Sequence, residues 1–164
     1  MEYKELIRDF AKRTRINLSI FRRIQKEHPE IIEHYKKEEP QTDMYEVTQL
    51  INSLLGLLVF PRKEFVGKIP YKKIIELKQE GWPIPRIKGD YAQVNNLNQL
   101  VRCLRNAIAH CNIEFISDSN KKIIGLELWN EDPKVNIITW RAELTIEEID
   151  IIGNKFIDLI LESA

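Results

Sequence analysis

Residues 95–111 read NNLNQLVRCLRNAIAHC, and the spacing of the apolar residues in this stretch decides its fold. Apolar residues return every three or four positions, and the stretch contains neither glycine nor proline. The spacing predicts a helix from about Asn95 to His110. Its apolar stripe consists of Leu97, Leu100, Leu104, Ile108 and Cys111.

A polar stripe lies beside the apolar one on the same predicted helix. Arg102, Asn106 and His110 follow one another at four-residue intervals and therefore share one helix edge, with Arg105 to the side. Two interpretations are open. These polar side chains can simply face solvent, with Arg105 paired to an acid and His110 stabilising the helix end. Alternatively, they can form a phosphate-binding site, because arginine binds phosphate through two hydrogen bonds.

The second interpretation implies a particular chemistry. An imidazole exchanges a proton near neutral pH, a guanidinium is a fixed cation, and an amide can orient either partner. Together they can activate a ribose 2′-hydroxyl against the neighbouring phosphodiester without a metal ion. No cysteine pair has zinc-ligand spacing, and neither GxGxxG nor GxxxxGK[ST] occurs. We therefore expect no metal site and no cofactor.

The segments before this helix are also predicted to be helical. Residues 3–25 lack glycine and proline and carry an apolar series at roughly helical spacing: Leu6, Phe10, Leu18, Phe21 and Ile24. A second helix has Thr42 and Asp43 as possible N-caps, and its body from Val47 to Phe60 is apolar nearly all round, which predicts burial. Pro61 should end it.

A short helix, Tyr71 to Gln79, is expected next, followed by a proline-punctuated loop from Gly81 to Gly89. Aromatic and basic residues alternate in and after this loop: Trp82, Arg86, Lys88 and Tyr91. Such a mixture can contact nucleic acid, but Trp82 is more simply interpreted as an apolar plug under the loop.

After His110 the period of the sequence changes from helical to alternating. Two strands are predicted on either side of a turn at Asp118–Asn120, and a third strand follows the EDP break at 131–133. Thr145 and Glu148 form a capping-box pattern that begins a last amphipathic helix. The predicted fold class is mainly α (α+β), a helical bundle with a small antiparallel sheet inserted at 113–142 before the C-terminal helix. The 164 residues fit a single domain, with residues 1–40 as an N-terminal helical region.

Charge and composition narrow the function classes. The net charge is +0, so the chain lacks the general basic character of many nucleic-acid binders. Seven lysines or arginines lie between Arg8 and Lys26, and acids dominate from Glu27 to Glu46. This pattern indicates either a surface that binds a polyanion or two helices that pair with each other. The simplest interpretation is that both stretches are solvated helix faces. His28 and His34 are expected at the surface.

The expected compartment is the cytoplasm. No apolar run reaches the length of a membrane span, and the first residues have no secretory apolar region. Cys103 and Cys111 lie about 12 Å apart along a helix, which is too far for a disulfide. Both are expected to be core residues.

The stretch LRNAIAH resembles the R-x4-6-H signature of the HEPN superfamily (higher eukaryotes and prokaryotes nucleotide-binding), in its RNxxxH form. Arg105 matches the signature arginine, Asn106 the polar residue after it, and His110 the signature histidine. The flanking sequence, over about 40–162, resembles a plasmid- and defence-associated bacterial subgroup. The inserted sheet departs from the plainest helical HEPN form.

The resemblance implies a helical bundle that dimerises and places two copies of the motif across a shared cleft. Active members are metal-independent endoribonucleases that leave 2′,3′-cyclic phosphate and 5′-hydroxyl ends. His110 would then be the general base or acid, Arg105 would stabilise the phosphorane, and Asn106 would orient the reacting groups. Arg102 is a further candidate for substrate binding. The expected partners are RNA, a second copy of the chain and, as for many HEPN toxins, a cognate antitoxin.

A second hypothesis uses the same fold without catalysis. Some HEPN proteins only bind a nucleotide or a partner protein, and the neutral net charge agrees with such an interaction module. The salt dependence of RNA binding separates the two hypotheses, because phosphate contacts produce a steep slope.

Overall fold

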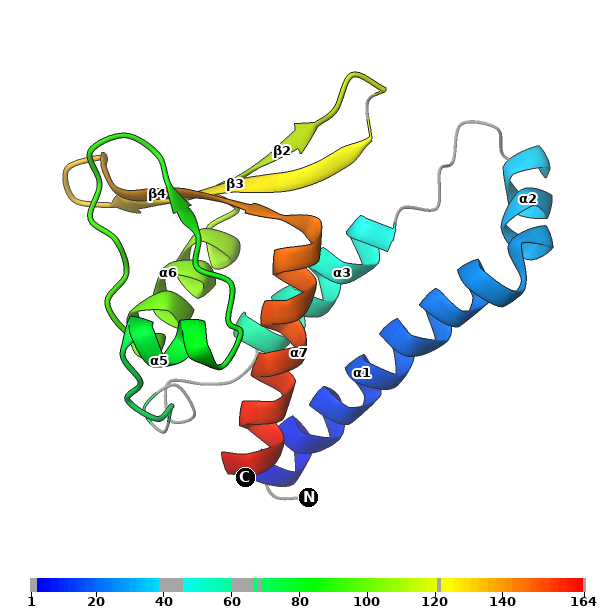
Figure 1. Cartoon of the computed structure of the whole chain (residues 1–164), viewed down its shortest axis with the longest axis horizontal. Helices are drawn as coiled ribbons and strands as arrows, with labels where there is room; N and C mark the ends of the chain where they lie inside the picture. Colours follow the sequence, from blue (N-terminus) through cyan, green and yellow to red (C-terminus); the bar gives the residue numbers. More distant parts are fainter. Residues whose placement is uncertain (1–2, 39–45, 60–66, 68, 121, 164) are drawn as a thin grey trace.

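The computed structural model describes residues 3–38, 46–59, 67, 69–120 and 122–163. Figure 1 shows a mainly helical molecule with one sheet. The helices are α1 (Tyr3–Glu27), α2 (Pro29–Glu38), α3 (Glu46–Leu54), the π-helical turn η1 (Leu55–Val59), α5 (Ile74–Gln79), α6 (Leu97–Ala109) and α7 (Ile146–Ser163). The strands are β1 (Arg86–Ile87), β2 (Ile113–Ser117), β3 (Ile123–Asp132) and β4 (Ile137–Thr145). The predicted fold class is therefore confirmed.

The sheet is antiparallel throughout, with the strand order β1-β4-β3-β2. Among the described residues it has four strands, where the sequence predicted three. The additional strand is β1, which lies in the segment expected to be a loop and pairs Arg86 with Glu143 and Ile87 with Ala142. A strand of two residues is too short to show alternation, so its pattern carried no signal.

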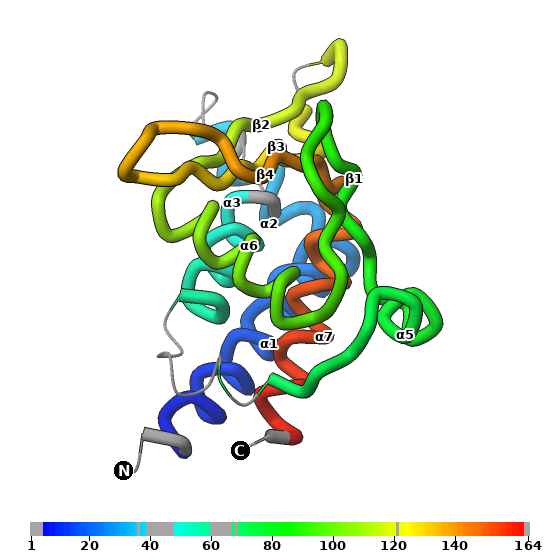
Figure 2. Tube along the Cα trace, turned by 90° about the vertical axis from the view of Figure 1, so that its left-hand side faces the viewer, coloured from blue at the N-terminus to red at the C-terminus, as the bar shows by residue number. Residues whose placement is uncertain are grey.

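The helices cover one face of this sheet. Figure 1 shows α3, α6 and α7 beneath the strands, and Figure 2 shows that α1 runs alongside α7. The buried strand residues Leu126, Leu128, Ala142 and Leu144 supply the sheet side of the core. Thr145 and Glu148 exchange hydrogen bonds at the start of α7, which confirms the predicted capping box.

Helix α1 is confirmed, but it is rotated relative to the predicted apolar face. The buried positions are Ile7, Ala11, Thr14 and Leu18, whereas Leu6 is 40% exposed. Two of the buried positions are the small Ala11 and the polar Thr14, whereas the predicted face was defined by large apolar side chains, which lie mostly on the neighbouring stripe.

The basic stretch in α1 pairs with another helix, but that helix is α7 and not the acidic segment that follows. Arg15 Nη2 lies 2.5 Å from Asp158 Oδ1, Arg22 pairs with Asp150, and Arg8 donates to the backbone oxygen of Leu161 at 3.2 Å. The three arginines are seven residues apart, which places them on one stripe of the helix. Much of the local basic charge is therefore used inside the fold.

Other predicted boundaries need correction. The helix predicted from Val47 to Phe60 is divided, because α3 ends at Leu54 and a π-helical turn continues to Val59. Helix α5 begins at Ile74 instead of Tyr71, since Lys73 forms a bridge with Asn96. Thr42, Asp43, Phe60 and Pro61 lie outside the described residues.

We predict that Gly125→Ala destabilises the sheet that supports α6. An added Cβ would lie 2.7 Å from the backbone oxygen of Leu144, and neither backbone can move without disturbing the β3–β4 ladder. The free energy of unfolding should fall by about 1–3 kcal/mol, measured by urea denaturation. Gly153→Ala is the control, because its Cβ would meet only Leu54 Cδ2 at 3.4 Å and alanine favours the helix. Equal stability of the Gly125→Ala variant and the wild type would contradict the prediction.

Candidate functional site

The candidate site lies on α6, and the burial of that helix determines which side chains face outward. The Asn96 side chain accepts a hydrogen bond from Gln99 N at 2.9 Å and caps the start of the helix. Seven of the thirteen residues are buried: Leu97, Leu100, Val101, Cys103, Leu104, Ala107 and Ile108. The predicted apolar stripe is thereby confirmed, except at Cys111.

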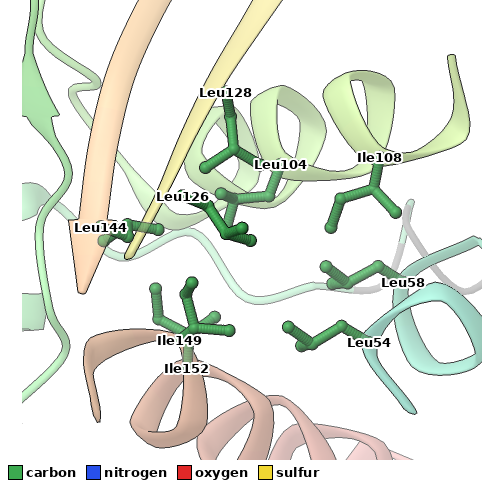
Figure 3. A pocket seen from close by; sticks show the side chains of 9 residues that line it. All are labelled: Leu54, Leu58, Leu104, Ile108, Leu126, Leu128, Leu144, Ile149 and Ile152. Atoms are coloured by element: carbon green, nitrogen blue, oxygen red, sulfur yellow. The ribbon is translucent and has the colours of Figure 1, made fainter. Parts of the chain in front are cut away.

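The contacts of this buried face are apolar. Figure 3 shows Leu104 and Ile108 of α6 pointing into a small pocket, opposite Leu54 of α3 and Leu58 of η1. Leucines of β3 and β4 and isoleucines of α7 close the pocket. Because this lining has no hydrogen-bonding side chains, rotating α6 to bring a polar residue into it would cost free energy.

The polar stripe accordingly lies on the outer side of α6. Arg102 and His110 are exposed, and Asn106 is half-buried between them. Arg105 is half-buried on the opposite flank. His110 lies five positions after Arg105, which turns their side chains about 140° apart at 3.6 residues per turn. One copy of α6 therefore presents the arginine and the histidine to different sides.

The ion pair that a structural role of Arg105 would require is absent from the part of the chain that the structure describes. Arg105 makes no ion pair there, and its Nε is buried without a hydrogen-bond partner. The same described residues offer no hydrogen bond to the side chains of Asn106 or His110. A buried donor without a partner costs free energy, so Arg105 has hydrogen-bonding capacity that the fold itself leaves unused.

Helix α6 ends in an unusual turn directly after the motif. His110 is the C-cap residue, and Cys111 takes φ 57. Cys111 N donates to Ile108 O at 3.1 Å and Asn112 N donates to Ala107 O at 2.9 Å, which is the Schellman pattern. Glycine is usual at the Cys111 position, because a Cβ is strained there.

The two cysteines differ from each other. Cys103 is buried, as predicted, whereas Cys111 is exposed and does not continue the apolar stripe. Cys111 is exposed because its left-handed conformation ends the helix and directs the chain away from the core. Burial raises the pKa of the Cys103 thiol, and the charge of Arg102 and a hydrogen bond from Asn130 only partly oppose that rise. Cys103 therefore remains a neutral core thiol.

Asn130 is a polar residue beside α6 that the sequence analysis missed. It lies on β3, next to Cys103 of α6, and its Oδ1 is buried without a hydrogen-bond partner in the described structure. Strand alternation could have identified it, since Leu126, Leu128 and Asn130 share one face and an amide at a core-facing position is uncommon.

The other candidates from the sequence do not join this site. Trp82 is buried, which confirms the plug interpretation, and the Lys155 ammonium lies 5.8 Å from its ring centroid. Arg86 and Lys88 each pair with a glutamate, Glu148 and Glu143 respectively, at 2.8 Å. The loop cations therefore interact within the fold.

The described residues contain neither a metal-binding cluster nor a helix that could span a membrane. Among them, no group of three or more histidine, cysteine or acidic residues is arranged to hold a metal ion. His28 and His34 are exposed on or beside α2, as predicted, and contact Glu30 and Glu38. No described helix is long and apolar enough to cross a membrane.

Comparison with known proteins identifies one family. The family model described as HEPN pEK499 p136 matches residues 1–164, which is the full chain. No curated protein matches the sequence. No solved structure matches the fold.

We predict that Cys111→Gly stabilises the protein, because glycine removes the strain of the left-handed residue after the motif. The free energy of unfolding should rise by about 1 kcal/mol, measured by urea denaturation. Asn136, with φ 52 in the turn between β3 and β4, offers a matched control. Asn136→Gly should have a smaller effect, since asparagine tolerates this conformation better than cysteine. A loss of stability in Cys111→Gly would show that the thiol makes a contact that outweighs the strain.

Proposed function

The chain belongs to the HEPN pEK499 p136 family, a family of plasmid-associated HEPN domains, and we propose that it is a metal-independent endoribonuclease acting as a toxin or in anti-phage defence. HEPN domains are typically ribonucleases. The observation that carries the proposal is the Arg105-Asn106-x3-His110 motif at the end of α6, whose side chains the described fold leaves without internal partners.

The proposed reaction uses the RNA's own 2′-hydroxyl as the nucleophile. His110 Nε2 or Nδ1 takes the 2′ proton while the oxygen attacks the adjacent phosphorus. The bond from phosphorus to the 5′ oxygen then breaks, and that oxygen takes a proton from an imidazolium. The products are a 2′,3′-cyclic phosphate and a 5′-hydroxyl end.

Arg105 has the role of stabilising charge. As the 2′ oxygen attacks, negative charge grows on the non-bridging phosphate oxygens, and a guanidinium can donate two parallel hydrogen bonds to them. The partly buried position of Arg105 favours this role, because electrostatic interactions are stronger where water is excluded. Asn106 orients the hydroxyl or the imidazole, and Arg102, one turn earlier, holds a neighbouring phosphate.

The divergence of Arg105 and His110 supports a dimeric site. Side chains that leave one helix about 140° apart do not converge readily on one phosphate. A two-fold axis beside α6 instead brings Arg105 of one copy toward His110 of the other. A cognate antitoxin would inhibit the enzyme by covering this outer face of α6.

One observation favours a non-catalytic alternative. Arg8, Arg15, Arg22, Arg86 and Lys88 all interact within the fold. These five cations are therefore engaged within the fold and do not contribute to a groove for RNA, and the same α6 face could instead bind a partner protein.

We predict that His110→Ala abolishes RNA cleavage, because the proton of the 2′-hydroxyl then has no acceptor. The measurement is incubation of purified protein with total RNA in excess EDTA, followed by analysis of the end groups. Wild-type protein should leave cyclic-phosphate ends. Arg105→Lys should slow cleavage by about 10²-fold or more, since an ammonium lacks the planar pair of donors.

The control for this experiment is His34→Ala, which changes an exposed histidine far from α6 and should leave the rate unchanged. Circular dichroism checks that each variant folds. Cleavage by His110→Ala at the wild-type rate would rule out the proposed mechanism. Absence of cleavage by the wild type, together with RNA binding that is insensitive to salt, would favour the interaction module.

A further inference from the structure

Helix α1 has a second apolar face on the side away from the core. Leu18 and Ala11 are buried against the rest of the protein, whereas Ile16 and Ile20 are 55% and 52% exposed. Ile24 continues the same outward stripe one turn later and is half-buried. Figure 1 shows that α7 lies on the inner side of α1 and that no other described helix or strand lies along its outer side. An exposed apolar stripe on a helix that is already packed indicates a docking surface.

The outward stripe of α1 is symmetric about Ile20. Ile16 and Ile24 lie four residues before and after it, and Arg13 and Glu27 lie seven residues before and after it. All five share one helix face at this spacing. When two such stripes pack antiparallel with Ile20 opposite Ile20, Ile16 meets Ile24 of the other copy. Arg13 then meets Glu27, so that opposite charges close both ends.

We propose that this stripe binds the same stripe of a second copy of this chain, antiparallel about a two-fold axis at Ile20. The stripe reads Arg13, three isoleucines and Glu27, so it is complementary to itself when turned end to end. This self-complementarity identifies a second copy of the chain as the partner. A different partner would not require that symmetry, whereas an isologous dimer requires it by definition.

The charges at each end already form pairs within one copy. Arg13 Nε lies 2.8 Å from Asp9 Oδ2, and Arg23 Nε lies 2.7 Å from Glu27 Oε2. In the antiparallel arrangement these pairs join into a row of alternating charge, Asp9–Arg13 of one copy against Glu27–Arg23 of the other. Exposed ion pairs stabilise little individually. Here they set the register, and burial of the isoleucines supplies the attraction.

A polyanion is a less suitable occupant of this face. Three of the seven cations between Arg8 and Lys26 face α7, and Arg13 and Arg23 have carboxylate partners on their own helix. The centre of the stripe is apolar, where a phosphate backbone would need donors. The stripe also lies apart from α6, since α3 and α7 lie between the two helices (Figure 1).

The first test is the mass of the particle in solution, measured by light scattering at about 50 µM, within the usual range for moderate interfaces. Ile20→Glu places two carboxylates opposite each other at the axis, so it should halve the mass of the wild-type assembly. Ile151→Glu is the control, because Ile151 is a 41% exposed isoleucine of α7 outside the stripe, and the mass should not change. An unchanged mass for Ile20→Glu would overturn the proposal, even if that variant binds RNA less well.

A charge swap tests the register. Arg13→Glu alone and Glu27→Arg alone each set like charges against each other at both ends, and each should weaken association by about tenfold. The double variant restores opposite charges and should recover most of that loss. A double variant that associates no better than either single variant would contradict the register. These readouts need no enzymatic activity, so they are independent of the proposed ribonuclease function.

Discussion

The burial of the apolar face of α6 is the constraint on which the rest of the structure depends. Burying a leucine or isoleucine side chain stabilises a fold by roughly 1.5–3 kcal/mol, and α6 buries several of them between the sheet, η1 and α7. Turning the helix by one residue, about 100°, would place Arg105 against apolar side chains and expose leucines. The rotation of α6 is therefore fixed, and with it the outward direction of Arg102, Asn106 and His110.

The end of α6 couples the motif to the sheet. Cys111 reverses the chain in a left-handed conformation, and Asn112 O then accepts a hydrogen bond from Trp129 N of β3 at 3.2 Å. His110 therefore lies between a helix that is fixed by packing and a strand that is fixed by pairing. Strained residues persist where the surrounding structure holds them, and they often occur beside functional groups. A rigid position suits the proton transfer that we propose for His110.

Much of this arrangement could be predicted from the sequence, because it depends on local patterns. The α6 stripe, β2, β3, β4 and the capping box of α7 each have a repeated spacing or a specific pair of residues. What the sequence left undetermined depends on contacts distant in the chain. Examples are the two-residue strand β1, the partner of the α1 arginines, and the rotation of α1, which buries the small Ala11 and the polar Thr14. Cys111 was misassigned because the helical period was extended through a residue that ends the helix.

The central claim is that Arg105 of one copy and His110 of another act on the same phosphate. The most direct measurement is the cleavage rate of a purified heterodimer in which one copy carries Arg105→Ala and the other His110→Ala. The account predicts that each parent homodimer is inactive. The heterodimer should regain up to about half of the wild-type rate, since one of its two Arg105–His110 pairings is intact. A heterodimer as inactive as its parents, beside an active wild-type dimer prepared in the same way, would contradict the shared site.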